Sequence, residues 1–144
     1  MWILRRFKAC IYAAVVYLVI ETPTGSFTKF VASKTRVSPL KSQTIPRLEL
    51  LSALLLARLM HSITSSLESE LSLTEPVCYT DSKVALFWVL GMNKTWKQFV
   101  QHRVSEIRKL LPTDCWRHCS GVENPADVPS RGLSPVKLSL SICG

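Results

Sequence analysis

The chain has 144 residues, of which 47% are hydrophobic and 19% are charged. This length fits one domain, and this apolar content excludes an intrinsically disordered chain. The 18 Lys and Arg against 10 Asp and Glu give a formal net charge of +8, which favours a polyanionic partner such as nucleic acid or an anionic membrane surface.

The N-terminal segment combines basic residues with an apolar run. Arg5, Arg6 and Lys8 precede the run at residues 9–20, as in the first two regions of a signal peptide. The run is shorter than the ~20 residues that span a bilayer. Its β-branched and aromatic residues favour a buried strand over residues 12–20. We therefore expect an intracellular protein of the cytoplasm or nucleus without a membrane partner, and secretory entry through residues 1–20 is the alternative.

A hairpin and a long helix follow. Residues 21–25 have the composition of a turn, and residues 26–37 predict the returning strand. Pro46 suits the first helical position and Thr44 suits a cap. Residues 48–67 are rich in Leu and Ala and are apolar on most faces, which predicts a buried helix.

The second half alternates short elements. We expect a strand at residues 77–80, a helix at 82–90 ended by Gly91, a helix at 96–111 stopped by Pro112, a strand at 115–119 and a helical turn opening at Asn124. This order predicts an α/β fold with a mixed sheet, in which an antiparallel hairpin and parallel strands are flanked by helices. We expect one domain over residues 1–138 and a flexible tail at 139–144.

The cysteines give no disulfide framework. Five Cys is an odd number without regular spacing, which favours reduced thiols. Cys115, His118 and Cys119 are close in sequence, but a structural zinc site needs a second pair of ligands. We do not predict zinc.

Three carboxylates stand out. Glu49, in the first turn of the predicted long helix, shares a stripe with Ala53, Leu56 and Met60. A carboxylate on a stripe that faces the core or a cleft is costly unless it is paired or bound to a metal. The alternative is a favourable interaction with the helix N-terminus.

Asp81 ends the strand at residues 77–80, where α/β sheets bind ligands, but the simplest interpretation of this residue alone is an N-cap. Asp127 follows Asn124 and Pro125, where it suits a capping box. Together with Glu49, these acids can converge at one edge of a sheet. Such a group calls for Mg²⁺, and two such ions clamp an in-line displacement at phosphorus.

Several blocks of sequence, in order, resemble the RNase H-like segment of BEL/Pao-type retrotransposon polyproteins. The resemblance covers residues 7–138. The resembling blocks are residues 11–18, 33–40, 45–50, 79–83, 96–104, 116–118 and 123–132.

The resemblance implies an RNase H fold with a mixed five-stranded sheet. It also implies hydrolysis of the RNA strand of RNA–DNA hybrids with two Mg²⁺ ions, held by the catalytic and metal-binding residues Glu49, Asp81 and Asp127. The implied partners are an RNA–DNA hybrid and, within a polyprotein, the reverse transcriptase and integrase segments.

The first strand departs from the family pattern. The family has a strand ending in Phe-x-Asp-Ala-Ser, whereas the place of its leading Asp falls here at about Arg6, and no acid precedes Glu21. An arginine repels cations. Residues 1–8 are therefore interpreted as a degenerate first strand, and we expect impaired hydrolysis. The alternatives are a non-catalytic nucleic-acid or protein interaction module on the same fold, and a small basic protein with an N-terminal signal or anchor segment. An integrase-type interpretation is weaker, because that group places its Glu last.

Basic residues gather in two regions that suit phosphate contacts without reading sequence. The expected nucleic-acid-binding residues are Lys34, Arg36, Lys41, Arg47, Lys97 and Arg103. A solvated surface is the alternative interpretation. For Trp88 and Trp96, core packing is favoured over contacts with nucleic acid.

Overall fold

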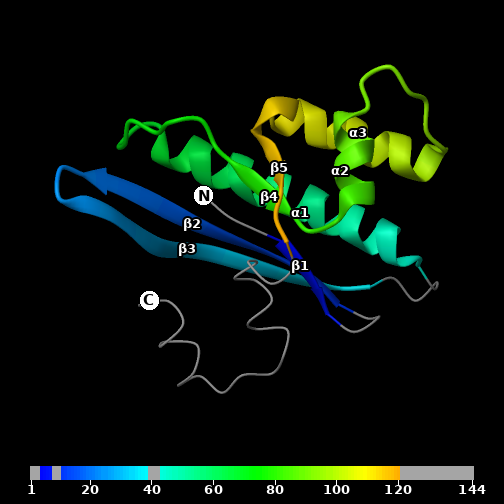
Figure 1. Cartoon of the computed structure of the whole chain (residues 1–144), viewed down its shortest axis with the longest axis horizontal. Helices are drawn as coiled ribbons and strands as arrows, with labels where there is room; N and C mark the ends of the chain where they lie inside the picture. The colour runs from blue at the N-terminus through cyan, green and yellow to red at the C-terminus, as the bar shows by residue number, and fades with distance from the viewer. Residues whose placement is uncertain (1–3, 8–10, 39–42, 121–144) are drawn as a thin grey trace.

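The computed structural model describes residues 4–7, 11–38 and 43–120. Its elements, in chain order, are β1 (Leu4–Phe7), β2 (Ile11–Thr22), β3 (Gly25–Val37), α1 (Ile45–Leu67), β4 (Cys78–Thr80), α2 (Lys83–Leu90), α3 (Gln98–Leu110), a 3₁₀ turn (Thr113–Cys115) and β5 (Trp116–His118). Figure 1 shows the long β2–β3 hairpin lying along α1, with α2 and α3 at one end. The predicted helical turn at Asn124 and the tail at 139–144 lie outside the described residues.

The first three strands form an antiparallel sheet in the order β1-β2-β3. β2 pairs with β3 from Ile11↔Val37 to Thr22↔Gly25, with a bulge beside Val16 and Tyr17. The Thr22 hydroxyl donates to the Gly25 carbonyl at 2.7 Å across the turn, and Gly25 has φ 145°, a conformation that favours glycine. The predicted hairpin is confirmed, and its strands extend closer to the turn than predicted.

The long apolar helix α1 supplies more of the described core than any other element. Thr44 is its N-cap, as predicted, although its side chain makes no capping hydrogen bond. Pro46 is the second residue of the helix, one position later than predicted. α1 is long and apolar enough to cross a membrane, but half of its most apolar window is buried inside the protein. Leu50, Leu56 and Met60 pack in one cluster with Ala14 and Val16 of β2, so α1 is the central helix of a globular core.

The second sheet contains β4 and β5, which are parallel. β1 contacts β4, which puts the strands in the spatial order β3-β2-β1-β4-β5. We predicted one mixed sheet. Within the described residues no ladder joins β1 to β4, although the two strands are in contact. The α/β class, the antiparallel hairpin and the parallel pair are confirmed.

The helices after β4 follow the sequence prediction closely. Gly91 is the C-cap of α2, and its N–H donates to the Phe87 carbonyl at 3.0 Å. Trp88 and Trp96 are half-buried and pack against the core, which confirms the packing interpretation. The predicted helix at 96–111 begins at Gln98, and the predicted strand at 115–119 is shorter by one residue at each end.

Candidate functional site

A hydrogen bond joins the helix carboxylate to the end of β4. The Ser82 hydroxyl donates to Oε2 of Glu49 at 2.6 Å, a short distance typical of a charge-assisted bond. Ser82 is 5% exposed, and Glu49 is half-buried. Because Asp81 immediately precedes Ser82, the structure brings two of the three predicted site residues to one place.

Ser82 also caps α2. Its hydroxyl accepts a hydrogen bond from the Ala85 N–H at 3.1 Å, and its own N–H donates to Oγ1 of Thr80 at 3.2 Å. We predicted Asp81 as the cap on local grounds, and this prediction is wrong, because the helix begins one residue later than that interpretation requires. Asp81 lies half-buried in the bend between β4 and the cap.

The position of Glu49 in α1 also differs from the prediction. The helix begins at Ile45, so its first turn holds no acidic residue and Glu49 lies beyond it. The favourable effect of a helix N-terminus decays within the first turn. The helix-end explanation of Glu49 therefore loses its basis, and the hydrogen bond from Ser82 accounts for the carboxylate instead.

The stripe that runs from Glu49 along α1 is confirmed as a core-facing surface. Ala53, Leu56 and Met60 are each 1% exposed. The carboxylate stands where this buried stripe ends, beside the N-terminus of α2. The contact between β1 and β4 adds the leading strand, Leu4–Phe7, to the neighbourhood of this site.

Two arginines flank one aromatic ring between α1 and α3. The guanidinium of Arg103 lies 3.6 Å from the centre of the Phe99 ring, and that of Arg47 lies 4.7 Å from it. Arg103 also donates to the Phe99 carbonyl at 2.8 Å. Burial lowers the pKa of Arg103 below its usual value, and the positive charges of Arg47 and Arg58 act in the same direction. This stack holds two positive charges close together.

The other predicted nucleic-acid-binding residues are distributed over β3 and the start of α3. Lys34 and Arg36 are exposed on β3, and Lys97 is exposed at the N-cap of α3. Lys41 lies outside the described residues. Arg108 has a structural role, because it donates to the carbonyls of Val89 and Trp88 near the end of α2.

A family model described as the Pao retrotransposon-like RNaseH-like domain matches residues 9–82, just over half of the chain. The chain belongs to this family. Searches of curated proteins and of solved structures give no significant match.

Membership of the Pao RNase H-like family confirms the predicted retrotransposon affiliation and the RNase H-like fold. The matched region contains β2, β3, α1 and β4, and with them Glu49 and Asp81. Asp127 lies outside both the matched region and the described residues, so its role remains a prediction.

The divalent metal that an RNase H-like family suggests needs several oxygen ligands. The described residues offer the carboxylates of Glu49 and Asp81, and the leading strand Leu4–Phe7 carries two arginines and no acid. Within the described part of the chain, no group of three His, Cys, Asp or Glu side chains is placed to hold a metal ion. These residues do not fit the two-ion arrangement that the resemblance implies, and we derive no hydrolytic step from them.

Three described cysteines are buried: Cys78, Cys115 and Cys119. A shared hydrogen bond with Cys115, together with burial, raises the pKa of Cys78 well above its ordinary value. Cys119 donates its backbone N–H to the Thr80 carbonyl at 3.1 Å, whereas His118 is exposed. Cys78 lies in β4 and faces Cys115, which directly precedes β5, and Cys119 directly follows β5.

Sequence reasoning missed two residues of this region. Ser82 was considered only as the start of a helix, although serine between a strand and a helix is a common cap and its hydroxyl can donate elsewhere. Phe99 gave no signal, because its place between Arg47 and Arg103 depends on how α3 packs against α1.

Proposed function

We propose that this chain is a nucleic-acid-binding RNase H-like module of a retroelement, which holds an RNA–DNA hybrid and cleaves it poorly. The observation that carries the proposal is that Glu49 and Asp81 are retained, whereas the leading strand carries positive charge where the family has an acid. Glu49 is hydrogen-bonded to Ser82 beside Asp81, while β1, the strand that contacts β4, has the sequence LRRF. The family's leading acid is thus replaced by positive charge.

The charge of the chain supports the binding part of the proposal. The net charge of +8 attracts phosphate backbones over distance. Exposed Lys34, Arg36 and Lys97 offer flexible phosphate contacts. The stack of Arg47 and Arg103 on Phe99 adds guanidinium groups whose positions are restrained before binding, so they lose less conformational entropy when phosphate arrives.

The first test measures binding of a labelled RNA–DNA hybrid by fluorescence anisotropy over a range of salt concentrations. We expect replacement of Lys34 or Arg36 by Ala to weaken binding about three- to tenfold and to lower the salt slope by about one each, because each removes one phosphate contact. Lys29→Ala is the matched control, since Lys29 is exposed on the same strand but lies near its turn. Failure of the wild-type chain to bind the hybrid at low salt would refute the binding part.

The second test addresses cleavage. We expect the wild-type chain to cleave a hybrid poorly in Mg²⁺, and we expect Arg6→Asp to raise cleavage by restoring a carboxylate to the leading strand. The control is Asp81→Asn in the Arg6→Asp background, which should remove the gain. Efficient Mg²⁺-dependent cleavage by the wild-type chain, abolished by Asp81→Asn alone, would show that the site is complete and contradict the proposal.

A further inference from the structure

Among the described residues, one edge of β2 lacks a neighbouring strand over more than half of its length. On one side β3 pairs with β2 from Ile11 to Thr22. On the other side the described residues of β1, Leu4–Phe7, pair with residues 11–14. Among the described residues no strand continues this pairing toward the turn, so the backbone of residues 18–21 meets no ladder on that side. An unpaired strand edge is a template for another strand.

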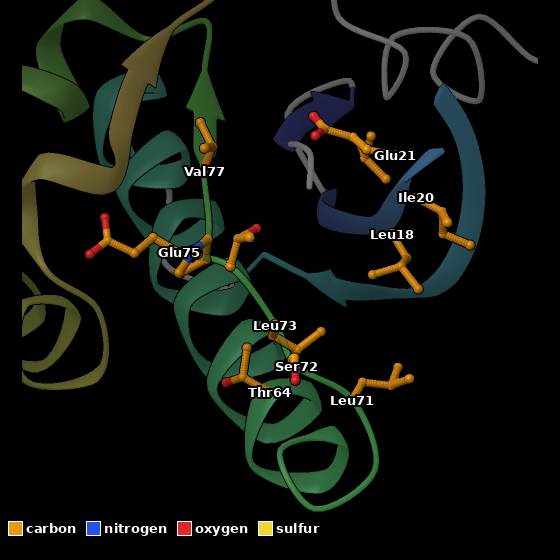
Figure 2. Close-up of a pocket in the computed structure, with 12 residues that line it drawn as sticks. Leu18, Ile20, Glu21, Thr64, Leu71, Ser72, Leu73, Glu75 and Val77 are labelled. Carbon is orange, nitrogen blue, oxygen red and sulfur yellow. The ribbon is translucent and has the colours of Figure 1, made fainter. Parts of the chain in front are cut away.

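A groove lies beside this open edge. Its volume is about 530 Å³, and it separates residues 18–21 of β2 from the connection at residues 71–77. Figure 2 shows Leu18 and Ile20 on the β2 side, Leu71 and Leu73 on the connection, and Thr64 on α1. Leu71 is 44% exposed and Ile20 is 37% exposed. The groove thus combines an unpaired backbone with an apolar lining that is accessible from outside.

The charge around the groove is opposite to that of the whole chain. Glu21 and Glu75 line it, and Glu68 lines the hollow next to it. The described residues that line the two hollows include no Lys, Arg or His. The last turn of α1, which ends here, also has no basic residue, so its carbonyl end contributes partial negative charge. This region repels phosphate backbones and attracts cations.

We propose that this groove takes an extended segment of a protein partner, which adds to β2 at residues 18–21 as a further strand. Backbone hydrogen bonds to the open edge would give affinity, as in strand-addition complexes. Because side chains alternate along a strand, the segment carries apolar residues on the face that meets Leu18, Ile20 and Leu71. Lys or Arg residues of the segment meet Glu21 and Glu75. The proposal goes beyond hybrid binding and does not depend on it.

A second copy of this chain is a less favourable occupant than a separate segment. Each copy carries a net charge of +8, so two copies repel one another over distance. A short segment with two or three positive charges adds little repulsion from the rest of the protein, and it gains the local attraction of the groove.

The test uses the full chain and a fluorescein-labelled eight-residue peptide of alternating Val and Lys. We expect binding by anisotropy, with amide shift changes in NMR spectra concentrated at residues 18–21. Glu75→Lys should weaken binding at least about tenfold, because it reverses a charge that lines the groove. Glu70→Lys is the matched control, since Glu70 lies on the same connection and is exposed but does not line the groove. It should change the affinity by less than about threefold.

A second probe separates strand addition from simple charge attraction. The same peptide, N-methylated at alternate residues, keeps its charge but loses the donors that pair with a strand edge. We expect it to bind at least about tenfold more weakly. Equal binding of the methylated peptide, equal effects of Glu70→Lys and Glu75→Lys, or shift changes centred on β3 would each overturn the proposal. Sedimentation that shows a dimer dissociated by the peptide would assign the groove to a second copy instead, and would also overturn it.

Circular dichroism of each variant verifies that it is folded, and hybrid binding by the same variants separates the two proposals. We expect Glu75→Lys to bind the RNA–DNA hybrid at least as well as the wild-type chain, because the change adds positive charge. Loss of peptide binding with retained hybrid binding is therefore the expected pattern.

Discussion

The two halves of β2 have similar apolar sequences and different surroundings. In the first half, residues 11–16, Ala14 and Val16 are both 0% exposed, whereas Val19 and Ile20 in the second half, residues 17–22, are 38% and 37% exposed. Residues 11–14 of this half pair with both β1 and β3, and Ala14, Val15 and Val16 pack against α1 in the core. In the second half, β3 is the one described strand that pairs with β2. The continuous apolar run defines the strand, but packing against α1 decides which part of the strand is core.

The test with the largest expected effect replaces one residue in each half of β2 by Asp. We expect Val16→Asp to lower the free energy of unfolding by about 4 kcal/mol or more, because it buries an unpaired charge. We expect Ile20→Asp to cost only about 1 kcal/mol, since water already reaches this side chain. Urea unfolding followed by circular dichroism measures both values. Similar costs at the two positions would mean that the halves are equally buried in solution.

Hydrogen exchange sharpens the same comparison without substitutions. Amides of the first half should exchange about 100-fold more slowly than those of the second, because opening the first half disrupts two strand pairings and the α1 core. Native-state exchange followed by NMR gives the ratio for amides that bond to β3 in both halves. Uniform protection along β2 would contradict the idea that its edge is open.

Ser82 tests the site beside β1 and β4. We expect Ser82→Ala to cost about 1–2 kcal/mol, because it removes both the cap on Ala85 and the hydrogen bond to Glu49. The control is Ser66→Ala. The Ser66 hydroxyl donates to the Ser62 carbonyl at an exposed position of α1, and Ala is a better helix former than Ser. Its unfolding free energy should stay within about 0.5 kcal/mol of the wild type. Equal effects of the two substitutions would remove the structural role assigned to Ser82.

The smallest expected effect concerns the exposed part of the hairpin. Tyr17 and Phe30 form an edge-to-face pair with ring centres 6.0 Å apart. We expect Phe30→Ala to lower the free energy of unfolding by about 1 kcal/mol. Phe27→Ala is the control, because Phe27 has a similar exposure of 56% and pairs with no other described ring. Thermal unfolding of both variants measures the difference, and a larger loss for Phe27→Ala would contradict the role of the ring pair.

Much of the fold followed from local sequence. Pro46 and the Leu-rich run predicted α1, and Gly91 predicted the end of α2, because capping and propensity act over a few residues. Within the described residues β1 and β4 are in contact but form no ladder. This could not be predicted, since the pairing of two strands depends on how the fold places them. The shift of the cap from Asp81 to Ser82 also depended on tertiary context, because both residue types are good caps.

The candidate site was only partly predictable for the same reason. The proximity of Glu49 to the end of β4 was predicted from the placement of the acids and is also implied by the resemblance, but the residue that joins them, Ser82, was not predicted. The stack of Arg47 and Arg103 on Phe99 could not be predicted, because it forms only when α3 packs against α1. The groove beside β2 depends on how far the described strand β1 extends along it. The sequence alone does not show which strand edges stay unpaired.

The composition of α1 has a consequence for the synthesis of the chain. A helix apolar enough to cross a bilayer is at risk of capture by the membrane or of aggregation when it leaves the ribosome uncovered. The chain order reduces this risk, because β2 and β3 are made before Ile45 emerges. The hairpin that covers the helix is therefore available as soon as the helix is complete. Moving the hairpin behind α1 by circular permutation would keep every contact and remove this early protection.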